Sequence, residues 1–459
     1  MKLSRYIAVA VLSLLMTSCG IYKKYEMPIE NSYVNQYAEA MAQQVDSTSL
    51  PCLGWEQVFT DPLLQDYIRR ALAQNTDIDN AVQNVRIAQA QLQGAKLSYF
   101  PSVALSPNGG AAKYGSGKMD TWTYTIPMSI QWEIDVFGKI LNRKRGARIT
   151  LEQMQEYQAA TRSQIISAVA NVYYSLVLMK QQLALTERTS EIWKDQVESM
   201  KLMKEAAMVN EAAVVQSTAN YWSIMSSIPD IRQGIHELNN SLALLLHEPA
   251  ATEYSVTDNL DFELPVSIEN GVPMYYLAAR PDVRAAERGI AAAFYSVNSA
   301  RAAFYPSLMI SSNGGFTNLL GSIVKNPGEF FIQLAGQLTA PLFSRGQNIA
   351  NLKVAKANQQ VAMNNFENTV LSASADVSDA LSQYRNNHEK REYLLKQINN
   401  LEKSVEYTQE LLTLDPKTTY LEVLTAQSSL LNAQLASLNC WHSKVAACIT
   451  LYQAVGGGR

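Results

Sequence analysis

The feature that most constrains the fold of this chain is a long internal repeat. An aromatic pair followed by proline occurs twice, as YFPSV from Tyr99 and as FYPSL from Phe304, and the two prolines are 205 positions apart. A second landmark follows each copy, DVFGK from Asp135 and PLFSRG from Pro341, with phenylalanines 206 positions apart. Two landmarks with nearly the same offset indicate a duplicated half rather than a short solenoid unit.

Each half predicts the same order of elements: a helix, two strands, a very long helix, a turn and a return helix. The opening helices are expected at roughly 77–98 and 281–303, since both stretches are rich in alanine and end before the aromatic-proline pair. Proline disfavours helix in the residue before it and suits the start of a strand. The leading strands are therefore expected near 102–107 and 307–315, each followed by a glycine-rich loop.

The second strand of each half carries a strict alternation of apolar and polar residues. In 121–135 the apolar residues occupy the even positions: Trp122, Tyr124, Ile126, Met128, Ile130, Trp132 and Ile134. In 329–342 one face collects Phe330, Ile332, Leu334, Leu338 and Leu342, and the other collects Gln333, Gln337 and Thr339. Strands of this length and pattern can cross a bilayer with one face to lipid and one to a lumen. They fit equally a soluble antiparallel sheet on the surface of a helical protein.

The number of strands bears on the membrane interpretation. Two hairpins give four strands, which cannot close around a lumen, and open sheet edges are not tolerated in lipid. A membrane-spanning sheet therefore requires several chains. No stretch beyond the N-terminus has 18 consecutive apolar residues, so a transmembrane helix is not expected.

Two very long helices with heptad spacing are predicted. The stretch 138–208 has no internal proline, and about 70 helical residues span roughly 105 Å. Apolar residues at intervals of three and four indicate a packed seam on each long helix. The seam positions are Ile165, Val169, Val172, Leu176, Met179 and Leu183 in the first half, and Leu394, Ile398, Leu401, Val405, Thr408 and Leu412 in the second. Such helices can form a hollow cylinder of coiled coils or a solid bundle.

Each long helix is expected to turn and the chain to return. The first turn is placed near 209–211, and the second at LDPK from Leu414. The return helices should extend to Leu246 and Tyr452. Pro229 should kink or break the first of them, because proline removes a helical hydrogen bond.

The N-terminus reads as a secretory signal. Lys2 and Arg5 precede a short apolar run over 7–16, which ends in MTSC at Cys19. This pattern predicts cleavage before Cys19 and lipidation of its thiol. An ordinary signal peptide with an incidental cysteine is the alternative.

The remaining cysteines are Cys52, Cys440 and Cys448. The last two are eight positions apart on a predicted helix, about 12 Å, which is too far for a disulfide. All three are expected as free, mostly buried thiols, although Cys52 could in principle pair with either of the others.

Composition argues against several classes of function. The formal net charge is −3 with a pI near 5.9, and the chain has no long basic cluster, so a nucleic-acid partner is not expected. The four histidines form no metal-ligand spacing or nucleophile–base motif. The glycines at 456–458 follow a helix at the C-terminus and form no phosphate loop. We expect no enzyme activity, no cofactor and no metal site.

These landmarks, taken in order, resemble the TolC-like outer-membrane factor family, in its lipoprotein branch that serves resistance-nodulation-division efflux pumps. The motif RPDVRAAE from Arg280 is the most specific of them. The others are Tyr25 and Pro28, Trp55, Phe59, Asp61-Pro62, Ala71-Leu72, Asn75, WEIDVFG from Trp132, LALLL from Leu242, GVP from Gly271 and YQAVGGG from Tyr452. His247 departs from a glycine frequent in relatives and is expected to be a helix-end residue.

The resemblance implies a mainly α chain with a pair of transmembrane β hairpins. As a homotrimer, its duplicated halves would form a twelve-stranded β-barrel on a twelve-helix periplasmic α-barrel. The implied partners are a periplasmic adaptor, an inner-membrane proton-driven pump and outer-membrane lipid. The implied function is the passive exit duct of a tripartite efflux pump in the cell outer membrane, extending into the periplasm.

The resemblance also suggests where the duct is gated and docked. Glu422 matches an acidic gate position of the family, and Thr425 a position that is acidic in some members. Three such carboxylates near one axis would repel one another and attract cations, whereas the alternative for Glu422 is a solvated helix face. The expected adaptor-docking tips are Val209, Asn210, Glu211, Asp415, Pro416 and Lys417, with Pro416 in place of a glycine-containing tip.

The predicted organisation has four segments. A signal peptide covers 1–18 and a lipid-anchored segment covers 19–60; the first repeat covers 61–255 and the second 256–459. Two other functions stay open from the sequence: the tunnel of a type I protein secretion system, and a lipid-anchored coiled-coil scaffold that conducts nothing.

Overall fold

The computed structural model describes residues 21–27, 37, 53–112, 121–262, 265, 274–320, 323–414 and 420–458. The predicted signal peptide, Cys19, Cys52 and the tip residues Asp415, Pro416 and Lys417 lie outside the described residues.

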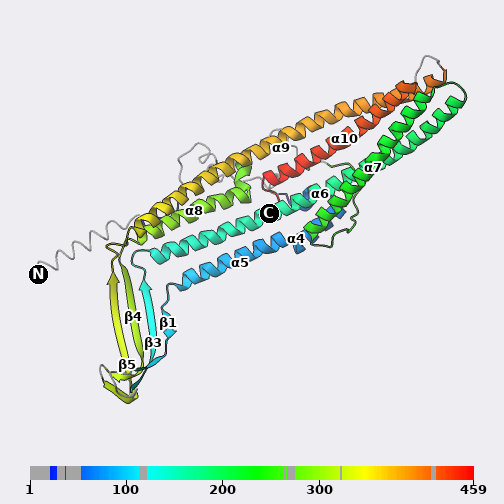
Figure 1. Ribbon diagram of the computed structural model, residues 1–459. Coiled ribbons are helices and arrows are strands. Elements are labelled where there is room, and N and C mark those ends of the chain that lie inside the picture. The colour runs from blue at the N-terminus through cyan, green and yellow to red at the C-terminus, as the bar shows by residue number, and fades with distance from the viewer. Residues whose placement is uncertain are drawn as a thin grey trace. The chain divides into compact units, whose positions relative to one another are not determined.

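The two halves of the chain have the element order predicted from the sequence (Figure 1). The first half contains α5 (Thr76–Leu97), β1 (Ser102–Leu105), β2 (Asn108–Ala112), β3 (Thr121–Ile134), α6 (Lys139–Glu205) and α7 (Glu211–Leu246). The second contains α8 (Pro281–Ala302), β4 (Ser307–Leu320), β5 (Ile323–Thr339), α9 (Gln347–Leu414) and α10 (Tyr420–Ala454). Two short helices, α3 (Trp55–Val58) and α4 (Pro62–Gln74), precede the first half, and the 3₁₀ helix η3 (Met274–Ala279) precedes the second.

Local chemistry explains several element boundaries. Asp61 caps α4 by accepting a 2.9 Å hydrogen bond from the backbone N–H of Leu63, and Pro62 occupies the first helical position. His247 ends α7 in the left-handed conformation with φ of 57°, as expected for a helix-end residue. The leading strand of the first half is interrupted after Leu105, and Pro107, which has no N–H to donate, lies in the gap.

Two predictions about the elements need correction. α7 continues through Pro229 as one helix of 36 residues, so the helix does not break there and only the kink stays a prediction. Pro229 is exposed, and water can satisfy the carbonyl group that loses its partner. β5 spans Ile323–Thr339, so it extends before the alternating stretch and ends before Leu342, which was expected on its apolar face.

The chain divides into two compact units, each built from both halves. The first unit comprises Met1–Glu30, Gln83–Glu156 and Arg284–Asn368, and the second comprises Asn31–Val82, Tyr157–Val283 and Thr369–Arg459. The five strands found in the described residues all belong to the first unit.

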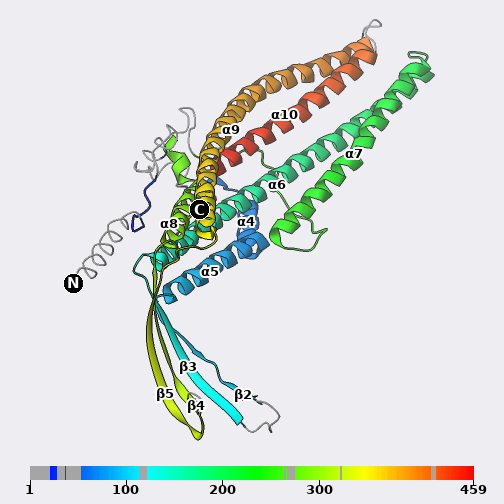
Figure 2. The same cartoon turned by 60° about the vertical axis from the view of Figure 1, so that its left-hand side comes forward.

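The strands of the first unit form one antiparallel sheet in the order β1-β3-β4-β5, with β2 also paired to β3 (Figure 2). The centre of the sheet is the pairing of β3 with β4, which joins the two halves: Ile126 lies opposite Phe316, and Ile134 lies opposite Leu308. β1 and β2 lie one after the other along the same side of β3, so they form one edge as a single interrupted strand, and β5 is the other edge.

The second unit is helical and has the larger apolar core. Tyr173, Tyr452, Phe59, Leu64 and Leu242 are among its fully buried side chains. The predicted second-half seam from Leu394 to Leu412 is partly covered at all six positions. None of the helices in the described ranges combines the length and apolar character that crossing a membrane requires.

Candidate functional site

The sheet has one apolar face and one polar face. The strand register places the apolar residues of neighbouring strands side by side, and it confirms the two predicted faces. The apolar face contains Val103, Leu105, Ile126, Met128, Ile130, Trp132, Ile134, Leu308, Ile310, Phe316, Phe330, Ile332, Leu334 and Leu338. The polar face contains two large apolar residues, Met309 and Phe331, and otherwise Ser129, Gln131, Glu133, Ser311, Asn313, Thr317, Glu329, Gln333, Gln337 and Thr339.

The apolar face is not covered by the rest of the described chain. Ile332 and Leu334 are 75% and 77% exposed, and Phe330 and Leu338 are similarly open. A contiguous apolar surface of this kind is unstable in water and marks contact with lipid or protein. The sheet is therefore suited to separate an apolar medium from an aqueous one.

The N-terminal segment is held at the point where β3 gives way to α6. Asn142, fully buried, donates hydrogen bonds to the carbonyl oxygens of Ile21 at 3.0 Å and Gly138 at 2.7 Å. Arg145 donates to the carbonyl oxygen of Tyr22 at 3.1 Å, and the Tyr22 hydroxyl donates to the carbonyl oxygen of Val136 at 2.5 Å. Burial and the nearby carboxylate of Asp135 raise the pKa of Tyr22. Ile21 is thus fixed close to the sheet, two positions after Cys19.

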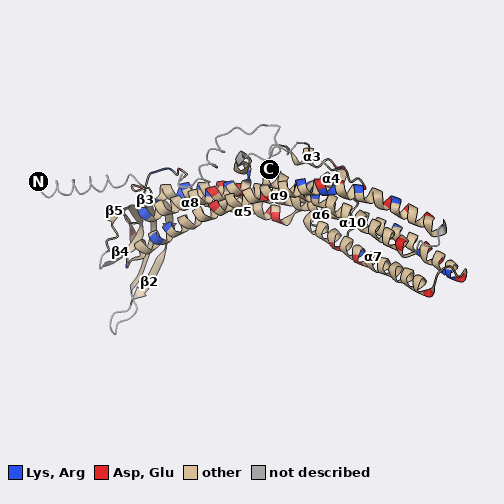
Figure 3. Cartoon of the chain, turned by 90° about the horizontal axis from the view of Figure 1, so that it is seen from above, with Lys and Arg blue, Asp and Glu red and all other residues tan. Residues whose placement is uncertain are grey.

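Positive charge gathers at the same place. The first ten residues of α6 carry five cations: Lys139, Arg143, Lys144, Arg145 and Arg148. Lys139 pairs with Glu133 at 2.9 Å, and Lys144 lies over the ring of Tyr99 at 5.4 Å. Figure 3 shows Lys and Arg on the helix ends beside the sheet. Cations next to an apolar sheet are typical of a boundary between membrane and water.

The arginine of the RPD motif ties three parts of the second unit together. Arg280 is 9% exposed and pairs with Asp282 at 2.8 Å and Asp376 at 3.1 Å. It also donates to the carbonyl oxygens of Ala373 and Ala454. A buried guanidinium needs such partners because an unpaired buried charge is strongly destabilising. Arg280 therefore joins the start of α8 to the middle of α9 and the end of α10.

The C-terminal glycines pack where a side chain has no room. A Cβ on Gly457 would lie 2.3 Å from the ring of Tyr452, and its carbonyl oxygen accepts a 2.6 Å hydrogen bond from Ser163. The Tyr452 hydroxyl donates to the carbonyl oxygen of Leu53 at 3.0 Å, and burial raises its pKa to about 12. These glycines thus have a packing role at the end of the chain.

The helical tips are held by a buried cluster within the second unit. Tyr420, Val423 and Leu424 of α10 pack against Trp193 and Met200 of α6 and Val214 of α7. The hydroxyl of Tyr420 donates to Ser217 at 3.0 Å. This tip cluster (Trp193, Met200, Val214, Tyr420, Val423 and Leu424) connects the start of α10 to the first helix pair.

The described residues of the first predicted tip have distinct positions. Val209 packs against the tip cluster, and Asn210 caps α7 by accepting a 3.1 Å hydrogen bond from Ala213. Glu211 is exposed and pairs with Lys204. Asn210 and Glu211 are therefore accessible at the turn.

The predicted gate residues share one exposed face of α10. Glu422 and Thr425 are both exposed, whereas Val423 and Leu424 between them are buried in the tip cluster. The Thr425 hydroxyl donates to the carbonyl oxygen of Leu421 at 2.7 Å. The cluster thus fixes the direction in which Glu422 and Thr425 point away from the helix pair.

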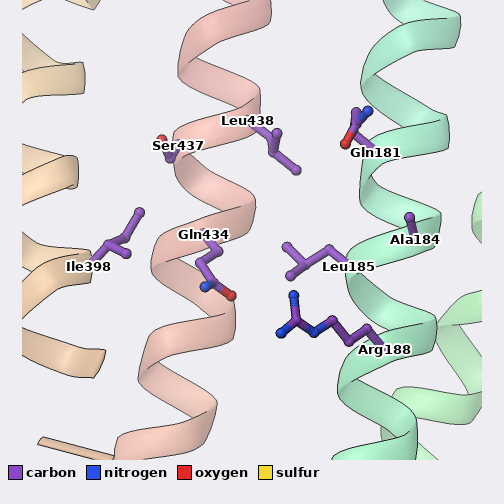
Figure 4. Close-up of a pocket in the computed structure, with 8 residues that line it drawn as sticks. All are labelled: Gln181, Ala184, Leu185, Arg188, Ile398, Gln434, Ser437 and Leu438. Atoms are coloured by element: carbon purple, nitrogen blue, oxygen red, sulfur yellow. The ribbon is translucent and has the colours of Figure 1, made fainter. Parts of the chain in front are cut away.

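A groove of mixed polar and apolar lining follows α6 and α10 in the second unit (Figure 4). It has a volume of about 390 Å³ and is lined by Gln181, Ala184, Leu185, Arg188, Ile398, Gln434, Ser437 and Leu438. Its polar side chains include neither a nucleophile with a base nor a set of metal ligands. Nor does any group of His, Cys, Asp and Glu elsewhere in the described ranges suit a metal ion.

The described cysteines match the prediction. Among the described residues, Cys440 and Cys448 are buried and form no disulfide, and burial raises the pKa of Cys440. A thiol with a raised pKa is protonated and unreactive at neutral pH.

The contacts that sequence reasoning missed join residues far apart in the chain. The hydrogen bond from Asn142 to Ile21 is not indicated by any pattern in the neighbouring sequence. The same is true of the ion pair between Arg280 and Asp376. One missed signal was visible: the runs 101–110 and 306–315 share Pro, Ser, Ser, Asn, Gly and Gly at a constant offset of 205. This match extends the repeat through the whole leading strand.

Comparison with known proteins gives consistent matches over nearly the whole chain. A family model described as "Outer membrane efflux protein" matches residues 67–247 and 273–457. The cation efflux system protein CusC of Escherichia coli O6:H1 is 26% identical, over 97% of this chain and 97% of that protein. The toluene efflux pump outer membrane protein TtgC of Pseudomonas putida is 25% identical, over 98% and 95%. A crystal structure of CusC superposes with a TM-score of 0.83 at 25% identity, covering 95% of this chain and 98% of that one.

Proposed function

The chain belongs to the outer membrane efflux protein family, and from that premise we propose that it forms the outer-membrane exit duct of a tripartite efflux pump. The two-faced sheet is the observation that carries the proposal. Its apolar face is exposed as a lipid-facing surface must be, and its polar face suits a water-filled lumen.

The sheet edges support a homotrimer. β1 and β5 each have a pairing partner on one side only among the described strands, and unpaired edges are not stable in lipid. Closure with further copies of the same chain removes both edges. Three copies would give the twelve-stranded barrel expected of the family.

The N-terminal contacts support a lipid anchor at Cys19. The two residues between Cys19 and Tyr22 span at most about 11 Å when extended. Because Tyr22 is bound beside the end of β3, acyl chains on Cys19 would enter the membrane next to the sheet. One chain gives only marginal membrane binding, so multiple acyl chains add a firm anchor to the barrel.

The helical tips are the proposed docking surface for a periplasmic adaptor. Val209, Asn210 and Glu211 lie at the described turn, and the sequence predicts the second tip at Asp415, Pro416 and Lys417. The adaptor would couple the duct to a proton-driven pump in the inner membrane. Relatives named for cations and for toluene suggest small toxic compounds as cargo, conducted passively.

Conductance across a planar lipid bilayer tests the proposal. The purified trimer should give stable ion-conducting channels. A pure trimer that inserts without conducting would favour the non-conducting scaffold instead.

A gate at Glu422 and Thr425 is part of the proposal. Their shared exposed face on α10 would place three carboxylates around the periplasmic opening of a trimer. Glu422→Ala should raise conductance or reduce the preference for cations, whereas Glu198→Ala, which removes an exposed acid of α6 paired with Lys201, should do neither. If both variants match the wild type, Glu422 is a solvated helix residue.

A further inference from the structure

The internal repeat defines equivalent residues in the two halves of the sheet. The runs 101–110 and 306–315 align at an offset of 205, so each residue of β1 has its counterpart in β4. The phenylalanines Phe137 and Phe343 align at an offset of 206, so each residue of β3 has its counterpart in β5. The pairing of β3 with β4 inside the chain is therefore a template for a pairing of β5 with β1.

The template includes an aromatic contact just beyond the ends of the paired strands. Phe137, which follows β3, stacks on Tyr305, which precedes β4, with ring centroids 5.1 Å apart and an angle of 21° between the planes. The counterparts of these residues are Phe343 and Phe100. Both are bare in the single chain, with Phe343 87% and Phe100 69% exposed.

β5 and β1 cannot meet within one chain, because they are the opposite edges of its sheet. We infer that they meet between copies: Phe343 of one chain stacks on Phe100 of the partner subunit, and β5 pairs antiparallel with the partner subunit's leading strand, which comprises β1 and β2. This inference deepens the proposed trimeric channel and rests on it.

The template also sets the register of that pairing. Inside the chain, Trp132 lies opposite Ile310 and Glu133 lies opposite Met309. Applying the two offsets places Leu338 opposite Leu105 of the partner subunit, and Thr339 opposite Ala104 of the partner subunit.

The faces of the strands agree with this register. Leu338 and Leu105 both lie on the apolar face, as shown by their pairing with Leu308 and Met128. Thr339 and Ala104 both lie on the polar face, opposite Ser307 and Ser129. A register shifted by one residue would bring apolar and polar faces together.

A pair of equivalent glycines points to the same neighbour. A Cβ on Gly315 would lie 2.0 Å from the carbonyl oxygen of Ile126, so the adjacent strand requires glycine there. Its counterpart Gly110 has nothing within 4 Å of the same position. Glycine at 110 is explained if β5 of another copy fills that space.

The register also gives an acceptable barrel geometry. Val103 of β1 lies opposite Ile130 of β3, and Ile130 lies opposite Ser312 of β4. Ser312 lies opposite Leu334 of β5, which would in turn lie opposite Gly109 of the partner subunit. Crossing one copy therefore moves the register from position 103 to position 109, a shift of six residues. Three copies shift it by roughly 18 residues, which for twelve strands corresponds to a tilt of about 46°. Strands that cross a bilayer are tilted by about 45°.

Disulfide trapping between copies tests the register. In the trimer, Thr339→Cys with Ala104→Cys should oxidise rapidly to covalently linked trimers, because directly opposed residues lie within disulfide distance. Thr339→Cys with Ser102→Cys is the matched control on the same face, two residues out of register. It should link at a rate lower by about tenfold or more, because diagonal neighbours are roughly 7–8 Å apart.

The outcomes separate the register from the trimer itself. A reduced variant that runs as a trimer but links no better than the control overturns the proposed pairing. If the Thr339 pair impairs assembly, Leu338→Cys with Leu105→Cys tests the same register on the other face. A wild-type chain that is never trimeric refutes the proposed function instead.

Discussion

Each half of the chain passes from a strand to a long helix through a junction with a left-handed glycine, but only the first junction is covered by other residues of the same chain. The first, between β3 and α6, turns at Gly138 with φ of +68° and is covered by Tyr22 and Tyr305. The second, between β5 and α9, turns at Gly346 with φ of +76° and leaves Leu342 96% exposed. Duplication thus left a glycine in the left-handed conformation before each long helix, but not the same contacts around it. Residues of the same chain cover the first junction, whereas the second would be covered only by residues of another copy.

Replacing a glycine should produce the largest difference between the two halves. Gly315→Val should prevent β3 from pairing with β4, because its side chain would meet a backbone carbonyl at 2.0 Å. Gly110→Val should leave the chain's own sheet intact and block only assembly. Overpacking of this kind costs typically 1–3 kcal/mol, and more against rigid backbone. Protease resistance of the monomer and trimer yield on native gels are the measurements. Equal loss of both in the two variants would show that the halves do not differ as described.

Truncation of the two phenylalanines should have a smaller but similarly divided effect. Phe137→Ala removes a stacking contact inside the chain and should lower the chain's own stability by about 2 kcal/mol. Phe343→Ala removes nothing that is packed in the single chain, so it should lower only the temperature at which the trimer dissociates. Thermal unfolding and heat-dependent gel migration distinguish the two. A Phe343→Ala trimer as heat-stable as the wild type would contradict the contact with Phe100 of the partner subunit.

The return helices differ in a third and smaller way, because each carries a histidine in a different environment. His442 on α10 is mostly buried beside Ser175, whereas His236 on α7 is exposed. Burial lowers the pKa of His442, so the folded state disfavours its protonated form. Stability that is present above about pH 6.5, the ordinary histidine value, should decline as the pH falls through the lowered pKa.

His442→Gln should therefore flatten the loss of thermal stability between pH 7 and pH 5. The expected change is a smaller loss of stability per pH unit than in the wild type, because the buried imidazole that resists protonation is gone. His236→Gln is the control and should keep the wild-type slope. A His442→Gln variant with an unchanged slope would assign the acid sensitivity to other groups.

Regular periodicity explains what the sequence could predict. Apolar residues at every second position from Trp122 to Ile134 specify a two-faced strand, and the register confirms those faces. Heptad spacing similarly predicts long helices, and α6 and α9 have 67 and 68 residues. Both patterns depend only on neighbours along the chain.

Contacts between distant residues could not be predicted in this way. Nothing near Asn142 indicates that it binds the backbone 121 positions earlier, and nothing near Arg280 identifies Asp376. The role of Glu422 is still harder to predict from the sequence of one chain. Glu422 lies on an exposed face of α10, but a pore axis exists only when several copies assemble.

The separation of lipid from water across the sheet is the central claim, and cysteine accessibility in lipid vesicles tests it most directly. Gln333 and Leu334 are adjacent in β5 on opposite faces. Gln333→Cys should react with a membrane-impermeant thiol reagent and lose conductance on modification, because its side chain faces the water-filled lumen. Leu334→Cys should stay unreactive and conduct normally. Equal labelling at both positions, or modification of Gln333→Cys without any change in conductance, would contradict this account of the sheet as the wall of a channel.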